Sequence, residues 1–385
     1  PAAAHPAAGQ ASSGSGGAPG AASGGTLAGW AVGATVGRIR PPPVLRLEAP
    51  GFVVRYPRIV NAALIPPGPL AAMDEAWTRF EFPPAPVTLL EVRDAIVVDD
   101  AMVFDRDLRV IAPTATGFDD AAVEAARARI RAAAADGRLN RHAGPSVLCK
   151  QLSPFNYGHF LLEMFPRAYL ARQVMPQLRL NYVFHRTTPL MLDVAYRSLF
   201  QLGIGLDQMT ITGPEPQRFD QLFLFDGLSD HGRYLSPLAV ASVEGLGLTV
   251  APGTARRLFV RRGGTEQRNL VDQDVVAARF ADAGWDVIDP STMTLVEQIT
   301  AFRAAAEVVG VGGAAMANIA FCEPGINVTL LQHAHMPDTF YWFIANIKRM
   351  DYAEVRCAPA GAQDATTWNG DFVAAEADIA ALLGG

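Results

Sequence analysis

The stretch EVVGVGGAAMANIAFCEPG (307–325) decides the fold class, because a buried strand runs into a glycine-rich turn and then into a helix start. This order is typical of parallel α/β sheets. The turn points free backbone N–H groups and the positive end of a helix dipole at its occupant. Small residues permit close approach, so phosphate or diphosphate is expected at Gly312, Gly313 and Ala314. A tight packing turn without a ligand is the alternative interpretation.

The alternation of strands and helices continues on both sides of this stretch. Around it, strands are predicted at 257–262, 285–289 and 326–332, and helices at 271–283 and 294–306. An earlier block has predicted strands at 146–152, 181–185 and 221–225, and predicted helices at 119–137, 158–173 and 189–203. Two such blocks predict two Rossmann-like domains that face a cleft, with parallel sheets covered by helices on both faces.

Composition and texture divide the chain into three parts. Residues 1–25 are almost entirely Ala, Gly, Pro and Ser, and such a segment buries too little surface to offset its ordering entropy. A disordered tail and linker is therefore predicted over 1–45. Residues 46–245 are predicted to form an N-terminal domain that begins with a β-rich extension and continues as a Rossmann-like block. Residues 255–385 are predicted to form a C-terminal Rossmann-like domain.

The overall composition excludes several classes of protein. Of 385 residues, 50% are hydrophobic and 18% are charged, which suits packed cores. A net charge of −6 argues against nucleic acid as a partner. The three cysteines are far apart and predict neither a zinc site nor a disulfide framework. Without an apolar run of ~20 residues or a signal peptide, a cytoplasmic protein is expected, with peripheral association at the inner face of the membrane as the alternative.

A second stretch, YGHFLLEMFPRAYL (157–170), places three ionisable groups on an otherwise apolar helix. His159, Glu163 and Arg167 follow one another at intervals of four residues, which is one stripe of an α-helix. Their apolar neighbours require the stripe to face a cleft or to be paired inside the core. A histidine beside a carboxylate is the usual way to build a general base. A salt-bridged helix edge worth only ~0.2–0.5 kcal/mol per pair is the alternative.

Three smaller motifs have competing interpretations. Residues 310–315 fit the loose dinucleotide pattern G-x-G-x-x-A, but no acid ends the next strand, so an NAD-dependent enzyme is only a further alternative. Residues 105–107 (DRD) resemble a metal-binding Asp-x-Asp signature, although a hairpin turn is the simpler interpretation. His333 and His335 end a strand and are expected at the surface.

Several arginines surround the predicted strand at 257–262. Its carboxyl end points toward the same cleft as the glycine turn, since ligands gather at that edge of open α/β sheets. Arg262 and Arg268 are therefore expected to bind phosphate through their guanidinium groups.

Taken together, these elements resemble glycosyltransferase family 61. The 157–170 stretch is similar to the family's Y-x-H-[WF]-L-x-E-x-x-P-R segment, and Arg262 and Arg268 fit its S-R-x5-R-x3-N-E element. Residues 295–302 match its L-x-E-Q-I-x-x-F helix. The glycine turn matches G-x-H-G-A-x-L-x-N-x-x-F-x-x-P-G at Gly310, Gly313, Ala314, Asn318, Phe321, Pro324 and Gly325. The four elements occur in the family's order across roughly 85–335.

The chain departs from the family pattern mainly on the donor side. Gly312 stands where the family has a histidine, and Leu330 where it has an acid. Arg261 replaces a serine, and Asp272 and Gln273 replace Asn-Glu. These differences favour, as the alternative function, a catalytically weak or inert relative that binds a nucleotide sugar or a glycan.

The resemblance implies a GT-B architecture, with the acceptor on the first domain and a nucleotide sugar on the second. It implies a hexosyl- or pentosyltransferase of bacterial surface or capsular polysaccharide biosynthesis. Transfer would be inverting and would need no essential metal. The donor would be a nucleotide sugar such as a UDP-sugar, and the acceptor a glycan or lipid-linked saccharide.

The resemblance also implies roles for individual residues. His159 or Glu163 would be the base with the other as its partner, and Arg167 an orienting or phosphate-facing charge. The implied donor-binding residues are Arg262, Arg268, Glu297, Gly312, Gly313, Ala314 and Asn318. Among these, Asn318 would fix the turn or touch the nucleotide, and Glu297 would bind the ribose or cap the domain.

Overall fold

The computed structural model describes residues 37–263, 267–361 and 368–384. Most of the segment predicted to be a disordered tail and linker, residues 1–36, lies outside the described residues. The rest of that segment differs from the prediction, because β1 (Arg38–Ile39) and β2 (Pro43–Ala49) both pair with strands of the first sheet. Alternating apolar side chains in β2 pack on the core, which explains why it folds as a strand.

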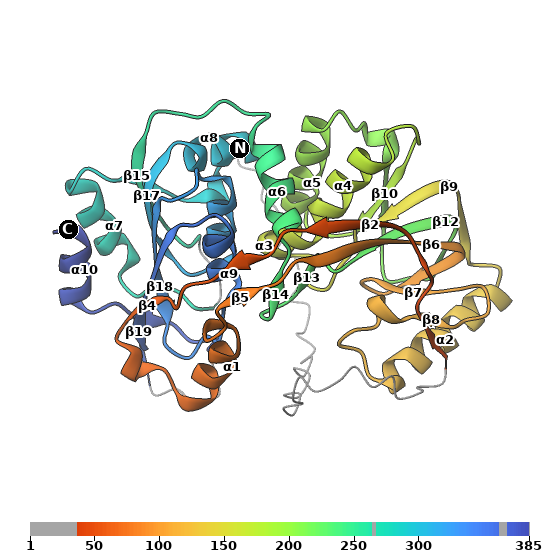
Figure 1. The fold of residues 1–385 in the computed structure, drawn as a ribbon, viewed down its shortest axis with the longest axis horizontal. Coiled ribbons are helices and arrows are strands. Elements are labelled where there is room, and N and C mark those ends of the chain that lie inside the picture. The colour runs from red at the N-terminus through yellow and green to blue at the C-terminus, as the bar shows by residue number, and fades with distance from the viewer. Residues whose placement is uncertain (1–36, 264–266, 362–367, 385) are drawn as a thin grey trace, which may run out of the picture. The chain divides into compact units, whose positions relative to one another are not determined.

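The first sheet has nine strands in the order β1-β8-β7-β6-β12-β9-β10-β11, with β2 beside β6 (Figure 1). Its strands are β6 (Ala85–Val98), β7 (Met102–Phe104), β8 (Val110–Ile111), β9 (Asn140–Leu148), β10 (Asn181–His185), β11 (Met209–Thr212) and β12 (Gln217–Asp226), together with β1 and β2. The predicted strands β9, β10 and β12 pair in parallel as expected, and β11, which was not predicted, pairs in parallel with β10. However, β12 also pairs antiparallel with the long β6, so this sheet is mixed.

The second sheet has seven strands in the order β16-β15-β17-β18-β19-β20, with β4 beside β19. Its strands are β4 (Arg58–Val60), β15 (Arg256–Val260), β16 (Asp286–Ile288), β17 (Ala305–Val311), β18 (Asn327–His333), β19 (Asp351–Pro359) and β20 (Phe372–Val373). All except β20 pair in parallel. The N-terminal β4 thus completes a sheet whose other strands follow residue 255.

Helices connect these strands and cover the sheets. Their bounds are α1 (Pro67–Trp77), α2 (Asp120–Ala135), α3 (Tyr157–His159), the π-helix η3 (Phe160–Met164), α4 (Phe165–Val174), α5 (Pro189–Gln201), α6 (Pro237–Gly247), α7 (Gln273–Asp282), α8 (Leu295–Arg303), α9 (Phe340–Ile347) and α10 (Glu376–Leu383). Four 3-10 helices are short: η1 (Ala62–Leu64), η2 (Ala112–Thr114), η4 (Leu206–Gln208) and η5 (Pro290–Thr292). A longer one, η6 (Ala314–Phe321), follows the glycine turn. Two small hairpins are β3 (Phe52–Val53) with β5 (Glu81–Phe82), and β13 (Ser229–Asp230) with β14 (Tyr234–Leu235).

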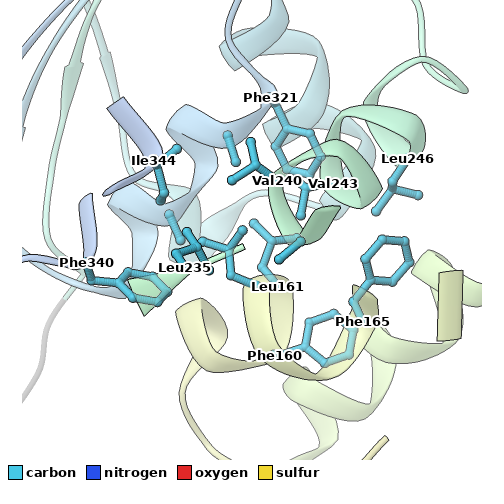
Figure 2. Packing of buried hydrophobic residues seen from close by; sticks show 14 of the residues in the cluster. Phe160, Leu161, Phe165, Leu235, Val240, Val243, Leu246, Phe321, Phe340 and Ile344 are labelled. Atoms are coloured by element: carbon cyan, nitrogen blue, oxygen red, sulfur yellow. The ribbon is translucent and has the colours of Figure 1, made fainter. Parts of the chain in front are cut away.

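One hydrophobic core joins the elements between the two sheets. Figure 1 shows α6 lying between them, and Figure 2 shows Leu161, Val240, Val243 and Phe321 converging from three different helices. These side chains belong to one buried cluster that also contains residues of α9. The two sheets are therefore held by shared apolar contacts, which fixes the walls of the space between them. No helix within the described residues is both long enough and apolar enough to span a bilayer.

The structure decides between the interpretations of two of the smaller motifs. Asp105 accepts hydrogen bonds from the backbone N–H groups of Asp107 and Arg109, at 3.0 and 2.8 Å, so the DRD motif is a turn between β7 and β8. The expectation that His333 lies at the surface is wrong, because it is fully buried at the end of β18. Its neighbour His335 is half-buried.

Candidate active site

Two adjoining cavities lie where loops of both sheets meet. The first, here the polar cavity, has a volume of about 450 Å³ and is lined by His159, His231, Arg262, Arg268 and Asp338, among others. The second, here the apolar cavity, has a volume of about 520 Å³ and is lined mainly by Phe155, Leu190, Met191, Val194, Pro290 and Val311. Five residues line both cavities: Ser153, Asn156, Arg262, Gly313 and Ala314. Volumes of this size fit small-molecule ligands.

A buried carboxylate joins two histidines at one side of the polar cavity. Glu163 is only 1% exposed and accepts hydrogen bonds from His159 Nδ1 at 2.7 Å and from His231 Nδ1 at 3.2 Å. The two imidazole rings stack with their centroids 4.7 Å apart. Both histidines line the cavity, whereas Glu163 does not. Because Nδ1 of His159 points to the carboxylate, Nε2 is the nitrogen that remains for a ligand.

The π-helix explains why Arg167 leaves the predicted stripe. Phe165 N–H bonds to the carbonyl of Phe160, five residues back, so one extra residue enters the helical turn. One residue corresponds to a rotation of about 100° around a helix axis. His159 precedes the π-helix and still meets Glu163 inside it, but Arg167 follows it. Its guanidinium group bonds to Gln151 Oε1 at 3.0 Å and lines a different, smaller cavity.

The electrostatics of this group favour an ionised carboxylate. Burial alone would raise the pKa of Glu163, but the hydrogen bonds from His159 and His231 outweigh it and lower the pKa to about 2. The hydrogen bond with Glu163 is also the main cause that raises the pKa of His231. The two hydrogen bonds from the imidazoles therefore favour the ionised form of the Glu163 carboxylate.

Among the described residues, these three side chains form the one group of His, Cys, Asp or Glu residues that could hold a metal ion. Their 2.7 Å nitrogen–oxygen distance is that of a charge-assisted hydrogen bond. In this structure the three side chains are hydrogen-bonded to one another, and each also offers one atom that could bind a metal ion.

Two arginines and the glycine turn form the opposite side of the polar cavity. Arg262 Nη1 donates to the carbonyl of Gly312 at 2.8 Å, and a Cβ added at Gly313 would lie only 2.0 Å from the same nitrogen. The backbone conformation does not require glycine there, because the φ of Gly313 (169°) is one that any residue adopts. Glycine is required because any side chain would occupy the place where the guanidinium group lies on the backbone. Burial and the nearby positive charge of Arg268 lower the pKa of Arg262. The arrangement favours an anionic ligand, which would relieve both effects.

The residues around this turn hold it in place. Gln273 accepts a hydrogen bond from the backbone N–H of Arg262 at 2.8 Å and donates to its carbonyl at 3.0 Å. Gln332 covers the other glycine, because a Cβ at Gly312 would lie 2.2 Å from its Oε1. Gln273, one of the residues that differ from the family pattern, thus holds the backbone of Arg262.

A chain of hydrogen bonds holds η6, the helix that follows the glycine turn. Asn318 is fully buried; it accepts from the Tyr157 hydroxyl at 2.6 Å and donates to Gln298 Oε1 at 2.8 Å. Gln298 in turn donates to the carbonyl of Pro290 at 2.9 Å. Asn318 thus joins η6, which follows the turn, to Tyr157 and to Gln298 of α8. Glu297 forms a capping box with Thr294 at the start of α8 and does not line either cavity.

Replacing Asn318 with alanine is expected to destabilise the protein by about 1–3 kcal/mol, because two buried polar groups would lose their partner. Chemical denaturation of wild type and variant measures this difference. Asn181, whose amide makes one exposed contact of 3.5 Å, provides the matched control, and its alanine variant should stay within about 0.5 kcal/mol of wild type. Equal losses in both variants would contradict this role for Asn318.

Of the residues predicted from the sequence, His159, Arg262, Arg268 and the glycine turn line one cavity, and Glu163 bonds His159 without lining it. Sequence reasoning missed His231, Gln332, Asp338 and Trp368, which also line that cavity. His231 lies in a short hairpin within a polar stretch that has no periodic pattern. Gln332 directly precedes His333 in the sequence. Only its position near the carboxyl end of β18 indicated a ligand site.

Comparison with known proteins agrees with this geometry. The family model described as Glycosyltransferase 61 matches residues 157–329, which contain the histidine–carboxylate group, both arginines and the glycine turn. No curated protein matches the chain. Glycosyltransferases act on a sugar donor and a glycan acceptor, and two facing sides of one cavity suit two such ligands. Residues 157–329 of this chain therefore belong to glycosyltransferase family 61.

Proposed function

We propose that this glycosyltransferase moves a hexosyl or pentosyl group from a nucleotide sugar to a glycan or lipid-linked saccharide, with inversion and without an essential metal. One observation carries the proposal. His159, bonded to a buried carboxylate, lines the same cavity as Arg262, Arg268 and the glycine turn. A proton acceptor and an anion-binding site face one space, as a one-step displacement requires.

The donor is proposed to extend across both cavities. Its nucleoside would occupy the apolar cavity, where the flat base would lie against apolar side chains such as Leu190 and Pro290. Its diphosphate would lie on the shared wall at Arg262, Gly313 and Ala314, where backbone N–H groups begin η6. The sugar would then enter the polar cavity beside His159. The nucleoside, the diphosphate and the sugar would thus follow one another from the apolar cavity, across the shared wall, into the polar cavity.

The chemical step follows from the groups on each side. His159 Nε2 would accept the proton of the acceptor hydroxyl while its oxygen forms the new bond to the anomeric carbon. The bond from that carbon to the diphosphate breaks, and the diphosphate leaves with the electron pair. Arg262, Arg268 and the turn would stabilise the charge that develops on it. Glu163 would orient His159, since it is buried and does not line the cavity.

A GT-B-like arrangement of the two sheets is part of the proposal, supported by their parallel strands and by the cavities between their loops. A role in bacterial surface or capsular polysaccharide synthesis, in the cytoplasm or at the inner face of the membrane, belongs to it as well. A catalytically weak or inert relative remains the second candidate, because Gly312, Leu330 and Gln273 differ from the family pattern on the donor side.

A thermal-shift screen of nucleotide sugars, with NAD as a comparison, tests donor binding. A true donor binds only the folded state and is expected to raise Tm by an increasing amount with its concentration. Turnover with saccharide acceptors then separates a transferase from an inert binder. Stabilisation by NAD alone, or binding of a nucleotide sugar without turnover on any acceptor, would contradict the transferase proposal.

A further inference from the structure

The buried carboxylate and its two histidines bring metal-binding atoms together from three separate segments. His159 ends α3, Glu163 lies in the π-helix η3, and His231 lies in the hairpin between β13 and β14. Each offers one ligand atom, and these atoms all lie within 4.8 Å of one another. Two histidines and one carboxylate are a ligand set that binds zinc in proteins, with a water molecule or a substrate in the remaining position.

The two histidines are held in place by contacts that need no ion. The hairpin that carries His231 is fixed at its next residue, because Thr339 Oγ1 donates a hydrogen bond of 2.8 Å to the carbonyl of Gly232. The ring of Phe340 packs beside both imidazoles, with its centroid 6.4 Å from that of His159 and 5.6 Å from that of His231. Ligands that are already gathered lose little freedom when an ion binds, which favours affinity.

The group has both the spacing and the access that an ion requires. Neighbouring ligand atoms of a tetrahedral zinc ion lie about 3.4 Å apart. The present nitrogen–oxygen distances of 2.7 and 3.2 Å are close to this value, so small side-chain rotations would admit the ion. Both histidines line the polar cavity of about 450 Å³, and the side chain of His231 is 54% exposed. An ion can therefore enter from the cavity while Glu163 closes the opposite side.

We propose that His159, Glu163 and His231 form a zinc site, with Nδ1 of each histidine and one carboxylate oxygen as ligands, and that bound zinc inhibits the transferase. The site goes beyond the proposed function and rests on the three side chains alone. Only its inhibitory effect rests on the proposed role of His159 as base. The active form remains the one without metal.

Inhibition follows from the two nitrogens of one imidazole ring. Zinc binding breaks both hydrogen bonds to Glu163 and forms two zinc–nitrogen bonds and one zinc–oxygen bond. An imidazole bound to a metal through Nδ1 carries its one proton on Nε2, so the proton that Nδ1 held moves to Nε2 or leaves to solvent. Nε2 of His159 then has no lone pair for the proton of the acceptor hydroxyl. Zinc binding and the action of His159 as a base are therefore mutually exclusive.

The ligand types also determine which ions are excluded. Imidazole nitrogen suits zinc and other transition metals, whereas Mg²⁺ and Ca²⁺ prefer sites made of oxygen atoms. Zinc is therefore expected to bind and magnesium is not.

Isothermal titration calorimetry of metal-free protein without a histidine tag tests the site directly. Wild type is expected to bind one zinc ion per chain, and Co²⁺ in its place should give the visible absorption of a tetrahedral ion. His159→Ala and His231→Ala each remove a ligand. Both should weaken zinc binding by at least about 100-fold, since losing even an outer partner of a metal ligand costs about 10–100-fold.

Two other histidines provide matched controls. His142 bonds Gln217 and lies outside both cavities. His335 belongs to the neighbouring pair His333 and His335, whose ring centroids are 5.2 Å apart. His142→Ala and His335→Ala should bind zinc as wild type does. Thermal unfolding shows whether each variant is folded, and His231→Gln, which keeps the size of the side chain, replaces His231→Ala if that variant is not.

Binding and turnover give separate outcomes. The site would be overturned by a wild type that does not bind zinc, by undiminished binding in the folded His159 and His231 variants, or by loss of binding in His335→Ala. One equivalent of zinc should abolish turnover and EDTA should restore it, so full turnover by zinc-saturated protein would overturn the inhibitory role. If zinc binding depends on both histidines but the metal-free protein turns over no nucleotide sugar, the site stands and the proposed function fails instead.

Discussion

His159→Ala is expected to lower kcat by about 10²–10⁴-fold while donor affinity stays near the wild-type value. The imidazole of His159 lines the cavity, and its Nδ1 bonds the carboxylate of Glu163, which leaves Nε2 to accept a proton. Removing it leaves the acceptor hydroxyl without a proton acceptor at the moment its oxygen attacks. Arg262 and the glycine turn are untouched, so the nucleotide sugar should bind as before. Steady-state kinetics and calorimetry with the donor measure the two effects separately.

Two further variants test whether the loss of kcat is specific to His159. Glu163→Gln keeps the shape of the side chain but removes its charge, and it should lower kcat less than His159→Ala. His142→Ala removes a histidine that is outside both cavities and should leave kcat within twofold of wild type. If His159→Ala retains more than a tenth of the wild-type kcat while it is folded, His159 is not the base.

Arg262→Ala is expected to lower kcat by about 10²–10³-fold and to weaken donor binding, because this guanidinium group lies on the turn where the diphosphate is proposed to leave. Arg262 contacts the carbonyl of Gly312 and lines both cavities. Arg262→Lys keeps the charge but loses the planar fork that binds two oxygens at once, so it should recover only part of the loss.

Gly313→Ala tests the same site without touching the arginine. The new methyl group would lie 2.0 Å from Arg262 Nη1 and 3.1 Å from its Cζ, so the guanidinium group must move. Backbone strain does not contribute, and stability should change little while the KM for the donor rises. Gly68→Ala is the matched control, since a Cβ there meets nothing within 4 Å. A wild-type KM in Gly313→Ala would contradict the placement of the diphosphate.

Much of the second sheet was predictable because its central strands are continuous apolar runs. β15, β17 and β18 lie where RLFVRR, EVVGVGG and INVTLLQ predicted them, and β10 matches NYVFH at 181–185. Strands buried on both faces leave this signal in the sequence. Pairing between distant strands leaves none. The antiparallel joining of β6 and β12 was therefore not predicted.

The candidate site was predicted in part for similar reasons. Spacing of four residues correctly joined His159 to Glu163, because their contact depends on one helical turn. The same rule failed for Arg167, since an extra residue in a π-helical turn has no signature in the amino-acid pattern. His231 reaches Glu163 from 68 residues away, through a hairpin that only the tertiary fold places there.

The strand β4 has a consequence for how the protein is made. Val60 pairs with Val355, so β4 leaves the ribosome about 300 residues before its neighbour β19. At ~5–20 residues per second this delay is on the order of 15–60 s. Throughout that interval the polar edge of β4 has no strand beside it in its own sheet. The half of the molecule proposed to bind the donor thus cannot be completed until a strand made about 300 residues after β4 has emerged.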